Sequence, residues 1–285
     1  MMQSRTQLAL SDSAFGHLRQ QIEKRSGLHF PEEKRYLLEN RLGQRLKELA
    51  LHSFDAYASY LGSLDGADGE WDVLLNLVTT RETYFFREVS QLKLITQELL
   101  PQVLQTKRQR GDTSLRLFSA ACSSGDEAYT LAILLAETTG LPIGMRWEVA
   151  GMDISPQAIS QAQAAIYGSY ALRHLPEGLL QKYFQEVPGQ GWQPVSLLRQ
   201  RVSFRRGNLM DPLQVRASGS HDIILCRNVL IYFDAEARRS ILANLAASLA
   251  PGGFLLTGFS ETPKDGVPGL EIRRFGVHTV YQRAF

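Results

Sequence analysis

A strand that breaks into a run of small residues and then a helix constrains this chain more than any other segment. Leu115, Leu117 and Phe118 have the apolar character of a short buried strand. Residues 119–125 are all small, and the apolar residues of 131–135 predict a buried helix of about three turns after them. Small side chains let a ligand approach the backbone, and a helix start presents free N–H groups. The segment therefore predicts the opening of a nucleotide-binding α/β unit.

Two carboxylates in the first predicted turn of this helix limit the kind of ligand that the segment can bind. Asp126 and Glu127 favour the helix dipole but would repel a pyrophosphate, so we expect a nucleoside without phosphates. Of the three spaced glycines of a dinucleotide fingerprint only Gly125 is present, which disfavours NAD or FAD, and the Gly-Lys-Ser or Gly-Lys-Thr of a P-loop is absent. An ordinary strand-turn-helix connection with acidic capping stays open for this segment alone.

Composition excludes several classes of protein. A chain of 285 residues with 44% hydrophobic and 21% charged residues has the balance of a soluble globular protein. It has no apolar run of membrane-spanning length and no secretory signal, so we expect a cytoplasmic protein without direct membrane insertion. Cys122 and Cys226 are the only cysteines and the six histidines are scattered, so we expect neither a metal nor disulfides. The net charge of +2 points to no partner by itself.

Residues 1–62 predict a small all-helical domain. Ser11 or Ser13 can cap a helix that stops at Gly27, and Pro31 stands where the first residue of a second helix would be. A third helix is expected from residue 53 to about residue 61. In the second helix an apolar stripe is bordered by cations that favour either a solvated face or a docking surface for an acidic partner: Lys34, Arg41, Arg45 and Lys47.

Residues 63–110 predict a joint and two helices that lead into a larger domain at 111–285. Gly62 to Gly69 is the first plausible joint, because it is rich in Gly, Asp and Ser. Helical spacing resumes at 71–78 and again at 91–105. The basic run from Lys107 to Arg110 then predicts a solvated linker into the organising strand.

The larger domain alternates strands and helices, which predicts a mostly parallel, doubly wound sheet. Asp153 ends the second predicted strand, where it can accept ribose hydroxyls or, as an alternative, cap the helix that starts near Ser155. A small β insert is expected at about 186–205, and an antiparallel edge strand at 278–282. The other predicted elements are helices at 155–166, 177–184 and 235–250 and strands at 147–153, 202–205, 222–226 and 254–257.

With these elements placed, the chain resembles the CheR-type chemotaxis receptor methyltransferases over essentially its whole length. The resemblance rests on Thr80-x-x-Thr83-x-Phe85-Phe86-Arg87, Gly125-Asp126-Glu127-x-Tyr129, Asp153, Asn208-Leu209 and Cys226-Arg227-Asn228-Val229-x-Ile231-Tyr232-Phe233. It implies a helical N-terminal domain, a linker and a Rossmann-like class I methyltransferase domain with a β insert. It also implies an enzyme that uses S-adenosylmethionine to convert receptor glutamates to methyl esters.

The resemblance further implies roles for individual residues. Arg87 and Tyr232 would be catalytic, nearest the reacting methyl, and the second helix would dock the methylation helices of chemoreceptors. The cofactor would be lined by Arg81, Thr83, Arg87, Glu127, Asp153, Asn208, Leu209, Asn228 and Val229. Two departures stand out: Arg81 replaces a usual asparagine that contacts the cofactor, and Ala128 replaces a usual proline. We expect a monomer that binds no nucleic acid.

Two other functions stay open. Arg81 would suit a non-catalytic cofactor-binding or scaffolding protein with the same fold, although Arg87 and Tyr232 argue against it. The second open function is a methyltransferase that acts on a different acceptor. However, Asn-Val-Leu-Ile-Tyr at 228–232 does not resemble the Asn/Asp-Pro-Pro-Tyr of enzymes that methylate base amines.

The insert leads to one further expectation. In some family members this subdomain binds a peptide at the receptor's C-terminus as an added strand. Here the insert looks shorter, and Pro188 and Pro194 remove backbone donors that strand pairing would need. We therefore expect no dependence on a C-terminal receptor tether.

Overall fold

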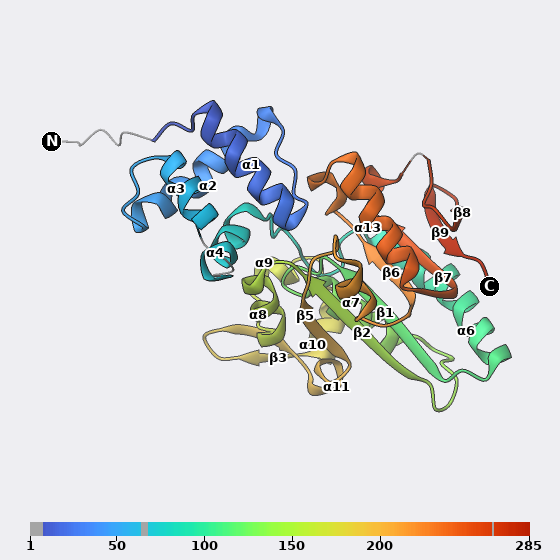
Figure 1. The fold of residues 1–285 in the computed structure, drawn as a ribbon. Coiled ribbons are helices and arrows are strands. Elements are labelled where there is room, and N and C mark those ends of the chain that lie inside the picture. Colours follow the sequence, from blue (N-terminus) through green and yellow to red (C-terminus); the bar gives the residue numbers. More distant parts are fainter. Residues whose placement is uncertain (1–7, 64–67, 264) are drawn as a thin grey trace. The chain divides into compact units, whose positions relative to one another are not determined.

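The computed structural model describes residues 8–63, 68–263 and 265–285, in two compact units (Figure 1). The helical unit contains the described residues up to Thr80 together with Tyr232–Asp234. The sheet unit contains Arg81–Ile231 and Ala235–Phe285. No helix of the described residues is long and apolar enough to span a membrane.

The helical unit begins as its capping signals predict. Helix α1 (Asp12–Ser26) is capped by Ser11, whose hydroxyl accepts a hydrogen bond from the Ala14 N–H, and it ends at Gly27 with φ 79°. The expected start of the second helix at Pro31 is wrong by one turn. Pro31 is extended and precedes a 3-10 turn (η1, Glu32–Lys34), so that α2 (Arg35–Glu48) begins at Arg35.

The helical unit also continues beyond residue 62, where the boundary was expected. After α3 (Phe54–Ser63), helix α4 (Asp68–Val78) packs against α2 and buries Trp71, Leu74, Leu75 and Val78. Apolar burial of this kind makes α4 part of the same core rather than a connector. Residues 64–67 of the expected joint lie outside the described residues.

Tyr232–Asp234 joins the helical unit through the chain after α1. The His29 N–H donates to the Tyr232 carbonyl at 2.9 Å, and Leu28 forms an isolated antiparallel β-bridge with Phe233. His29 Nδ1 lies 3.0 Å from Glu23 Oε1, and possible ligand atoms of His29, Glu23 and Asp234 all lie within 4.8 Å of one another. Sequence spacing does not reveal this group, and the expectation of no metal stays a prediction.

Two of the four cations expected on the docking surface have partners inside the helical unit. Arg45 donates to both carboxylate oxygens of Glu70, at 3.0 and 2.5 Å, and Tyr57 donates to Glu70 at 2.8 Å. Arg41 donates to the Val78 carbonyl and to the Thr80 hydroxyl. These contacts hold α2 to α4, whereas Lys47 is exposed.

In the described part of the sheet unit, seven strands form one sheet in the order β5-β2-β1-β6-β7-β9-β8. The first five strands are parallel, and β9 is antiparallel to both of its neighbours. The order in which successive strands are added to the sheet reverses between β1 and β6. The strands are β1 (Ser114–Ala120), β2 (Arg146–Asp153), β5 (Val202–Arg206), β6 (His221–Cys226), β7 (Leu249–Thr257), β8 (Leu270–Phe275) and β9 (His278–Arg283).

This topology confirms the predicted fold class and corrects one strand. The strand expected at 278–282 is antiparallel, but β9 pairs with β7 on one side and β8 on the other, so β8 is the edge. Four of the six residues of β8 are exposed, so the period-2 burial that reveals a strand in sequence is missing there.

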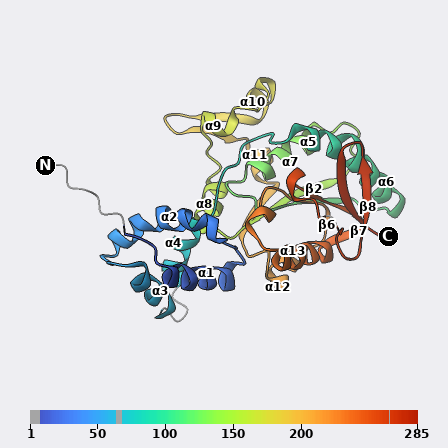
Figure 2. The same cartoon turned by 90° about the horizontal axis from the view of Figure 1, so that it is seen from above.

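Helices cover both faces of the sheet. Figure 2 shows α5 (Val89–Leu94), α6 (Leu100–Arg110) and α7 (Asp126–Glu137) on one face, and α12 (Pro212–Arg216) and α13 (Ala235–Ala247) on the other. A π-helical turn (η2, Ile95–Leu99) joins α5 to α6. The remaining short elements are α8 (Pro156–Ala164), α9 (Ser169–Leu172), α10 (Glu177–Tyr183), α11 (Ser196–Arg199), η3 (Leu230–Tyr232) and η4 (Phe259–Glu261).

The basic run at 107–110 is the last turn of α6 and not a linker, which corrects the sequence expectation. The Lys107 ammonium is buried between two carboxylates, 2.7 Å from Asp112 and 2.9 Å from Asp222. Lys107 lowers the pKa of Asp112 to about 2, because its hydrogen bond favours the ionised carboxylate.

The insert is a two-stranded antiparallel hairpin of β3 (Phe184–Val187) and β4 (Gly191–Pro194). Trp192 exchanges both backbone hydrogen bonds with Tyr167, at 2.8 and 2.9 Å, so β4 is paired on its outer side as well. Pro188 lies in the turn and Pro194 at the end of β4. The argument that Pro188 removes a strand donor is therefore wrong, and independence from a receptor tether stays a prediction.

The contact of Arg45 with Glu70 leads to a stability prediction. Arg45→Met should lower the free energy of unfolding by about 3 kcal/mol, because it leaves the buried Glu70 carboxylate without its cation. Lys47→Met is the matched control on the same helix and should change it by less than about 0.5 kcal/mol. Urea denaturation measures both. Equal effects would show that Glu70 needs no cation.

Candidate functional site

The parallel strands bring their carboxyl ends to one edge of the sheet. β1 ends at Ala120, β2 at Asp153 and β6 at Cys226, and each runs directly into a loop that carries predicted site residues. The reversal of strand order between β1 and β6 marks the position where open α/β sheets bind ligands. The site is therefore built on this edge.

The loop between β1 and α7 is fixed by its backbone. Gly125 has φ 90°, and a Cβ there would lie 2.8 Å from the Phe204 ring, so packing as well as conformation requires a glycine. The Cys122 N–H donates to the Met152 carbonyl and the Ser123 N–H to Asp153 Oδ2, both at 2.9 Å. This loop is held against the end of β2 before any ligand arrives.

Asp153 receives backbone donors on both carboxylate oxygens. Ser123 N–H donates to Oδ2 and Ser155 N–H to Oδ1, each at 2.9 Å. Ser155, and not Asp153, caps α8, so the alternative capping role for Asp153 is wrong. Burial raises the pKa of Asp153, while these donors and the charge of Arg81 act in the opposite direction. A carboxylate has about four acceptor positions, so about two remain for hydroxyl groups.

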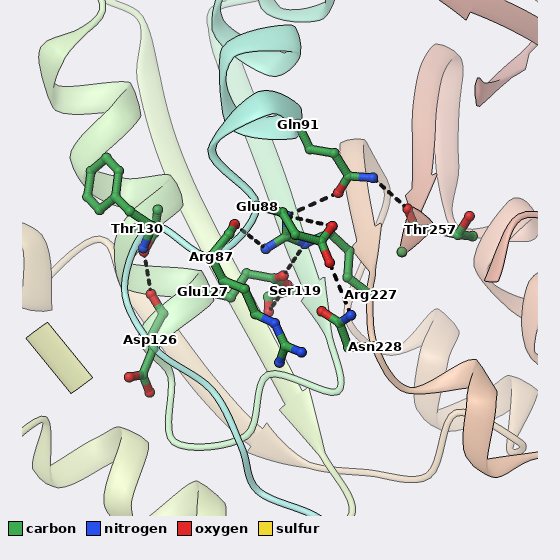
Figure 3. A network of polar contacts seen from close by, with 12 residues as sticks. Arg87, Glu88, Gln91, Ser119, Asp126, Glu127, Thr130, Arg227, Asn228 and Thr257 are labelled. Carbon is green, nitrogen blue, oxygen red and sulfur yellow. Dashed lines mark hydrogen bonds and ion pairs between the residues drawn. The ribbon is translucent and has the colours of Figure 1, made fainter. Parts of the chain in front are cut away.

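A buried guanidinium, Arg227, connects three segments of the site (Figure 3). Its side chain is 2% exposed and lies directly after β6. Nε donates to Glu127 Oε2 at 2.8 Å, Nη1 to Gln91 Oε1 at 3.1 Å and Nη2 to the Arg87 carbonyl at 3.0 Å. Ser119 donates to the other oxygen of Glu127 at 2.7 Å. Arg227 therefore fixes the Glu127 side chain and the Arg87 backbone together.

The backbone around Arg87 is bent by two residues in the left-handed region. Phe86 has φ 59° and Glu88 φ 57°, and the Phe86 N–H donates to the Thr130 hydroxyl at 3.2 Å. In Figure 3 the Arg87 carbonyl faces the network while its guanidinium points away from it. That guanidinium donates to the Glu82 carbonyl at 2.7 Å. The network thus orients Arg87 without neutralising its charge.

The loop after β6 is also held by a buried carboxylate, Glu261. It accepts backbone N–H bonds from Asn228 at 2.6 Å and from Gly258 and Ile231 at 3.1 Å. Asn228, with φ 58°, donates its side-chain amide to Glu88 at 3.1 Å. Burial raises the pKa of Glu261, and the backbone donors oppose that rise.

The other predicted residues are less closely connected. Asn208 follows β5 and accepts from the Met210 N–H at 3.0 Å, and Leu209 is buried. Thr83 and Val229 are half-buried, and Arg81 is exposed. Tyr232 belongs to the helical unit, as do the four cations proposed for docking, so their roles stay predictions.

Sequence patterns gave no role to Arg227, Gln91 or Glu261. Arg227 had a usable signal, because an arginine directly after an apolar strand at a ligand-binding edge needs an anion. Glu261 and Gln91 had none, since their partners are backbone groups and residues far away in the chain.

Asp126 is a buried carboxylate at the start of α7. It is 1% exposed, Ser124 donates to its Oδ2 at 2.6 Å, and its Oδ1 has no hydrogen-bond partner among the described residues. Burial raises the pKa of Asp126 to about 6, against smaller opposing effects of hydrogen bonds and of the Arg173 charge. At neutral pH an ionised carboxylate is therefore kept next to Glu127 at a free-energy cost.

Comparisons with known proteins agree with this architecture. Residues 13–79 match the all-alpha domain of the CheR methyltransferase family, and residues 81–271 match its SAM-binding domain. Chemotaxis protein methyltransferase 2 of Vibrio cholerae serotype O1 is 32% identical over 97% of this chain and 95% of its own length. Chemotaxis protein methyltransferase of Escherichia coli K12 is 36% identical over 92% of this chain and 88% of its own length.

Solved structures give a weaker likeness. Magnesium protoporphyrin IX methyltransferase from Synechocystis PCC 6803 with bound SAM has a TM-score of 0.33 and 18% identity, over 76% of this chain and 92% of that chain. A TM-score of this size adds nothing to what the sequence relatives establish.

The pKa of Asp126 predicts the pH dependence of stability. Because the folded-state value of about 6 lies above the usual 3.8, ionisation of Asp126 costs stability as pH rises through this range. Asp126→Asn should therefore raise the free energy of unfolding by up to about 3 kcal/mol at pH 8 and by about half as much at pH 5. Denaturation at several pH values tests this, with exposed Asp265→Asn as control. A pH-independent difference would contradict it.

Proposed function

Because this chain belongs to the CheR methyltransferase family, we propose that it transfers the methyl group of S-adenosylmethionine to glutamate side chains of chemotaxis receptors. The products are glutamate methyl esters and S-adenosylhomocysteine. The observation that carries the proposal is the Arg227 network, which joins the Glu127 carboxylate and the backbone of Arg87 in one hydrogen-bonded group. That arrangement suits a reaction whose main requirement is position.

The polar groups at the sheet edge fit the cofactor. Asp153 keeps about two acceptor positions for the ribose hydroxyls. The buried Ser123 hydroxyl and Asp126 Oδ1 have no hydrogen-bond partner among the described residues, as expected beside a polar ligand. The acidic start of α7 suits a cationic ligand without phosphates better than a dinucleotide. We assign the remaining contacts to Arg81, Thr83, Glu127, Asn208, Leu209, Asn228 and Val229.

Arg81 has a physical reason to be tolerated at this edge. Burial raises the pKa of Asp153, and the charge of Arg81 is one of the effects that oppose this rise, so the exposed guanidinium favours the ionised carboxylate that the ribose needs. We propose that Arg81 also binds the cofactor carboxylate through a charge-assisted contact.

The chemistry needs no general base in the protein. S-adenosylmethionine supplies an electrophilic methyl group on a sulfonium. A glutamate with an ordinary pKa of about 4.3 is already an anion at neutral pH. As the carboxylate oxygen bonds to the methyl carbon, the carbon–sulfur bond breaks and both charges disappear. A site for this reaction must align the two groups. It must also exclude water, because a dry site favours a reaction in which charge is lost.

We assign the alignment of the carboxylate to Arg87 and Tyr232. The Arg87 guanidinium forms no ion pair with a carboxylate of the described residues, and among these residues it donates a hydrogen bond only to the Glu82 carbonyl. It can therefore bind a substrate carboxylate without first breaking an ion pair. Its contact must stay moderate, because the carboxylate loses its charge in the transition state.

Receptor docking belongs in this proposal to α2. Arg45 is paired with the Glu70 carboxylate, whereas Arg41 donates, among the described residues, only to a carbonyl and a hydroxyl group, which leave its charge uncompensated. The free charge of this surface therefore comes from Arg41, the exposed Lys47 and the half-buried Lys34. Such exposed cations contribute steering and salt-sensitive affinity for an acidic receptor helix. We further propose that the enzyme acts in the cytoplasm as a monomer.

A labelled-methyl assay tests the proposed function. The protein, labelled S-adenosylmethionine and membranes from its own source should give a labelled receptor band, and mild base should release the label because it hydrolyses esters. Base-stable label would indicate another acceptor, and absence of label in spite of cofactor binding would indicate a non-catalytic protein.

The variant Arg87→Ala tests the proposed mechanism. It should lower turnover by about 100-fold while S-adenosylhomocysteine affinity changes by less than about threefold, because its proposed role is orientation. Calorimetry and initial rates provide the two values. Equal losses of affinity and rate would make Arg87 a cofactor ligand only.

A further inference from the structure

Three side chains with metal-ligating atoms meet in the helical unit, although they come from distant parts of the chain. Glu23 lies near the end of α1, His29 follows that helix, and Asp234 directly precedes α13. Each offers one ligand atom, and these atoms all lie within 4.8 Å of one another. All three residues belong to the helical unit. We call Glu23, His29 and Asp234 the His29 triad.

The turn after α1 brings His29 back beside Glu23. Gly27, with φ 79°, ends the helix, and its N–H donates to the Glu23 carbonyl at 2.7 Å. The Leu28 N–H donates to the buried Ser26 hydroxyl at 3.1 Å, which fixes the direction of the chain after the turn. His29 Nδ1 then reaches Glu23 Oε1 at 3.0 Å. Local hydrogen bonds therefore position the first two members of the triad.

Backbone contacts position Asp234 as well. The His29 N–H donates to the Tyr232 carbonyl at 2.9 Å, and Leu28 forms its antiparallel bridge with the buried Phe233. These contacts immediately precede Asp234 in the chain, so they hold its segment alongside His29. A site whose backbone is already ordered loses little conformational entropy when an ion binds. The triad is therefore largely preorganised.

The triad suits a first-row transition metal better than magnesium or calcium. An imidazole nitrogen with carboxylates is a ligand set for ions such as Zn²⁺, whereas Mg²⁺ and Ca²⁺ prefer oxygen ligands alone. With bonds of about 2.0–2.2 Å, two ligand atoms on one zinc ion lie no more than about 4.3 Å apart. Atoms already within 4.8 Å of one another need only small side-chain adjustments to reach that geometry. The side chains of His29 and Glu23 are 34% and 35% exposed, so an ion can enter from solvent.

We propose that the His29 triad binds a divalent transition-metal ion such as Zn²⁺, and that the ion clamps the Tyr232–Asp234 segment onto the chain after α1. A metal-bound imidazole is neutral, so the two carboxylates balance the charge of a divalent ion. Three protein ligands leave one tetrahedral position for water. The ion takes no part in the proposed methyl transfer, which needs no metal. It acts on the stability of the segment that contains Tyr232.

Titration of Zn²⁺ into untagged protein that has been treated with a chelator tests the site. Calorimetry gives the affinity and the stoichiometry, and thermal unfolding gives Tm with and without the ion. The triad variants are His29→Gln, Glu23→Gln and Asp234→Asn, each checked for folding by circular dichroism. His52→Gln and Glu33→Gln, at exposed residues of the same unit, are matched controls for the loss of an imidazole and of a carboxylate. Mg²⁺ is the control ion.

The wild type should bind one Zn²⁺ ion at the triad and gain in Tm, because an ion that binds only the folded state stabilises it. Each triad variant should weaken Zn²⁺ binding by about 10- to 100-fold, since loss of an outer-shell partner alone has an effect of this size. Both control variants should match the wild type. Zn²⁺ should also slow hydrogen exchange of the His29 amide, whose bond to the Tyr232 carbonyl breaks when the two segments separate.

Several results would overturn the inference. They are absence of Zn²⁺ binding, Zn²⁺ binding that all three folded triad variants leave unchanged, and unchanged exchange of the His29 amide in the Zn²⁺-saturated protein. Equal binding of Mg²⁺ would contradict the assigned class of ion, because Mg²⁺ has little preference for an imidazole. None of these measurements depends on methyl transfer, so the proposed function and the metal site can fail separately.

Discussion

The hydrogen bonds of one buried guanidinium decide how the site is assembled. Arg227 is 2% exposed, so its charge is tolerated only with partners of good geometry, and it has three. Those partners come from helix α7, helix α5 and the backbone of Arg87. Removal of such a cation would leave the partly buried Glu127 without its partner, at a cost of up to about 3–5 kcal/mol. The geometry of the start of α7 and of the Arg87 segment is therefore set together.

The charged side chains divide into two groups by their partners. Arg45, Lys107 and Arg227 each contact a carboxylate inside their own unit, and they stabilise helix packing or the sheet edge. Arg87 and Arg41 donate to uncharged oxygen atoms instead. A cation that keeps its charge uncompensated near a site suits an anionic substrate, whereas a paired cation suits structure. This distinction assigns roles that the residue type alone does not.

Much of the fold follows from local patterns in the sequence. The apolar run of β1, the small residues after it and the spacing of α7 are local signals, and so are Ser11 and Gly27 at the ends of α1. Contacts between residues that are distant in the chain give no such local signal. Lys107 looked like part of a solvated run because Asp222, which it contacts, lies 115 residues later. β8 was missed because an edge strand with mostly exposed residues has no periodic burial. The role of Asp153 could be predicted from its position at the end of β2. The backbone donors that hold it could not.

The most direct test of this account is the effect of Arg227→Met on the site as a whole. The variant keeps an unbranched side chain of moderate volume and loses every donor, with Arg227→Lys retaining the charge. In protein that stays folded by circular dichroism, the account predicts that Arg227→Met loses both S-adenosylhomocysteine affinity and turnover. Arg227→Lys should recover affinity more than turnover, because a single ammonium can pair Glu127 but cannot also hold the Arg87 carbonyl. Unchanged affinity and turnover in folded Arg227→Met would contradict the claim that this guanidinium assembles the site.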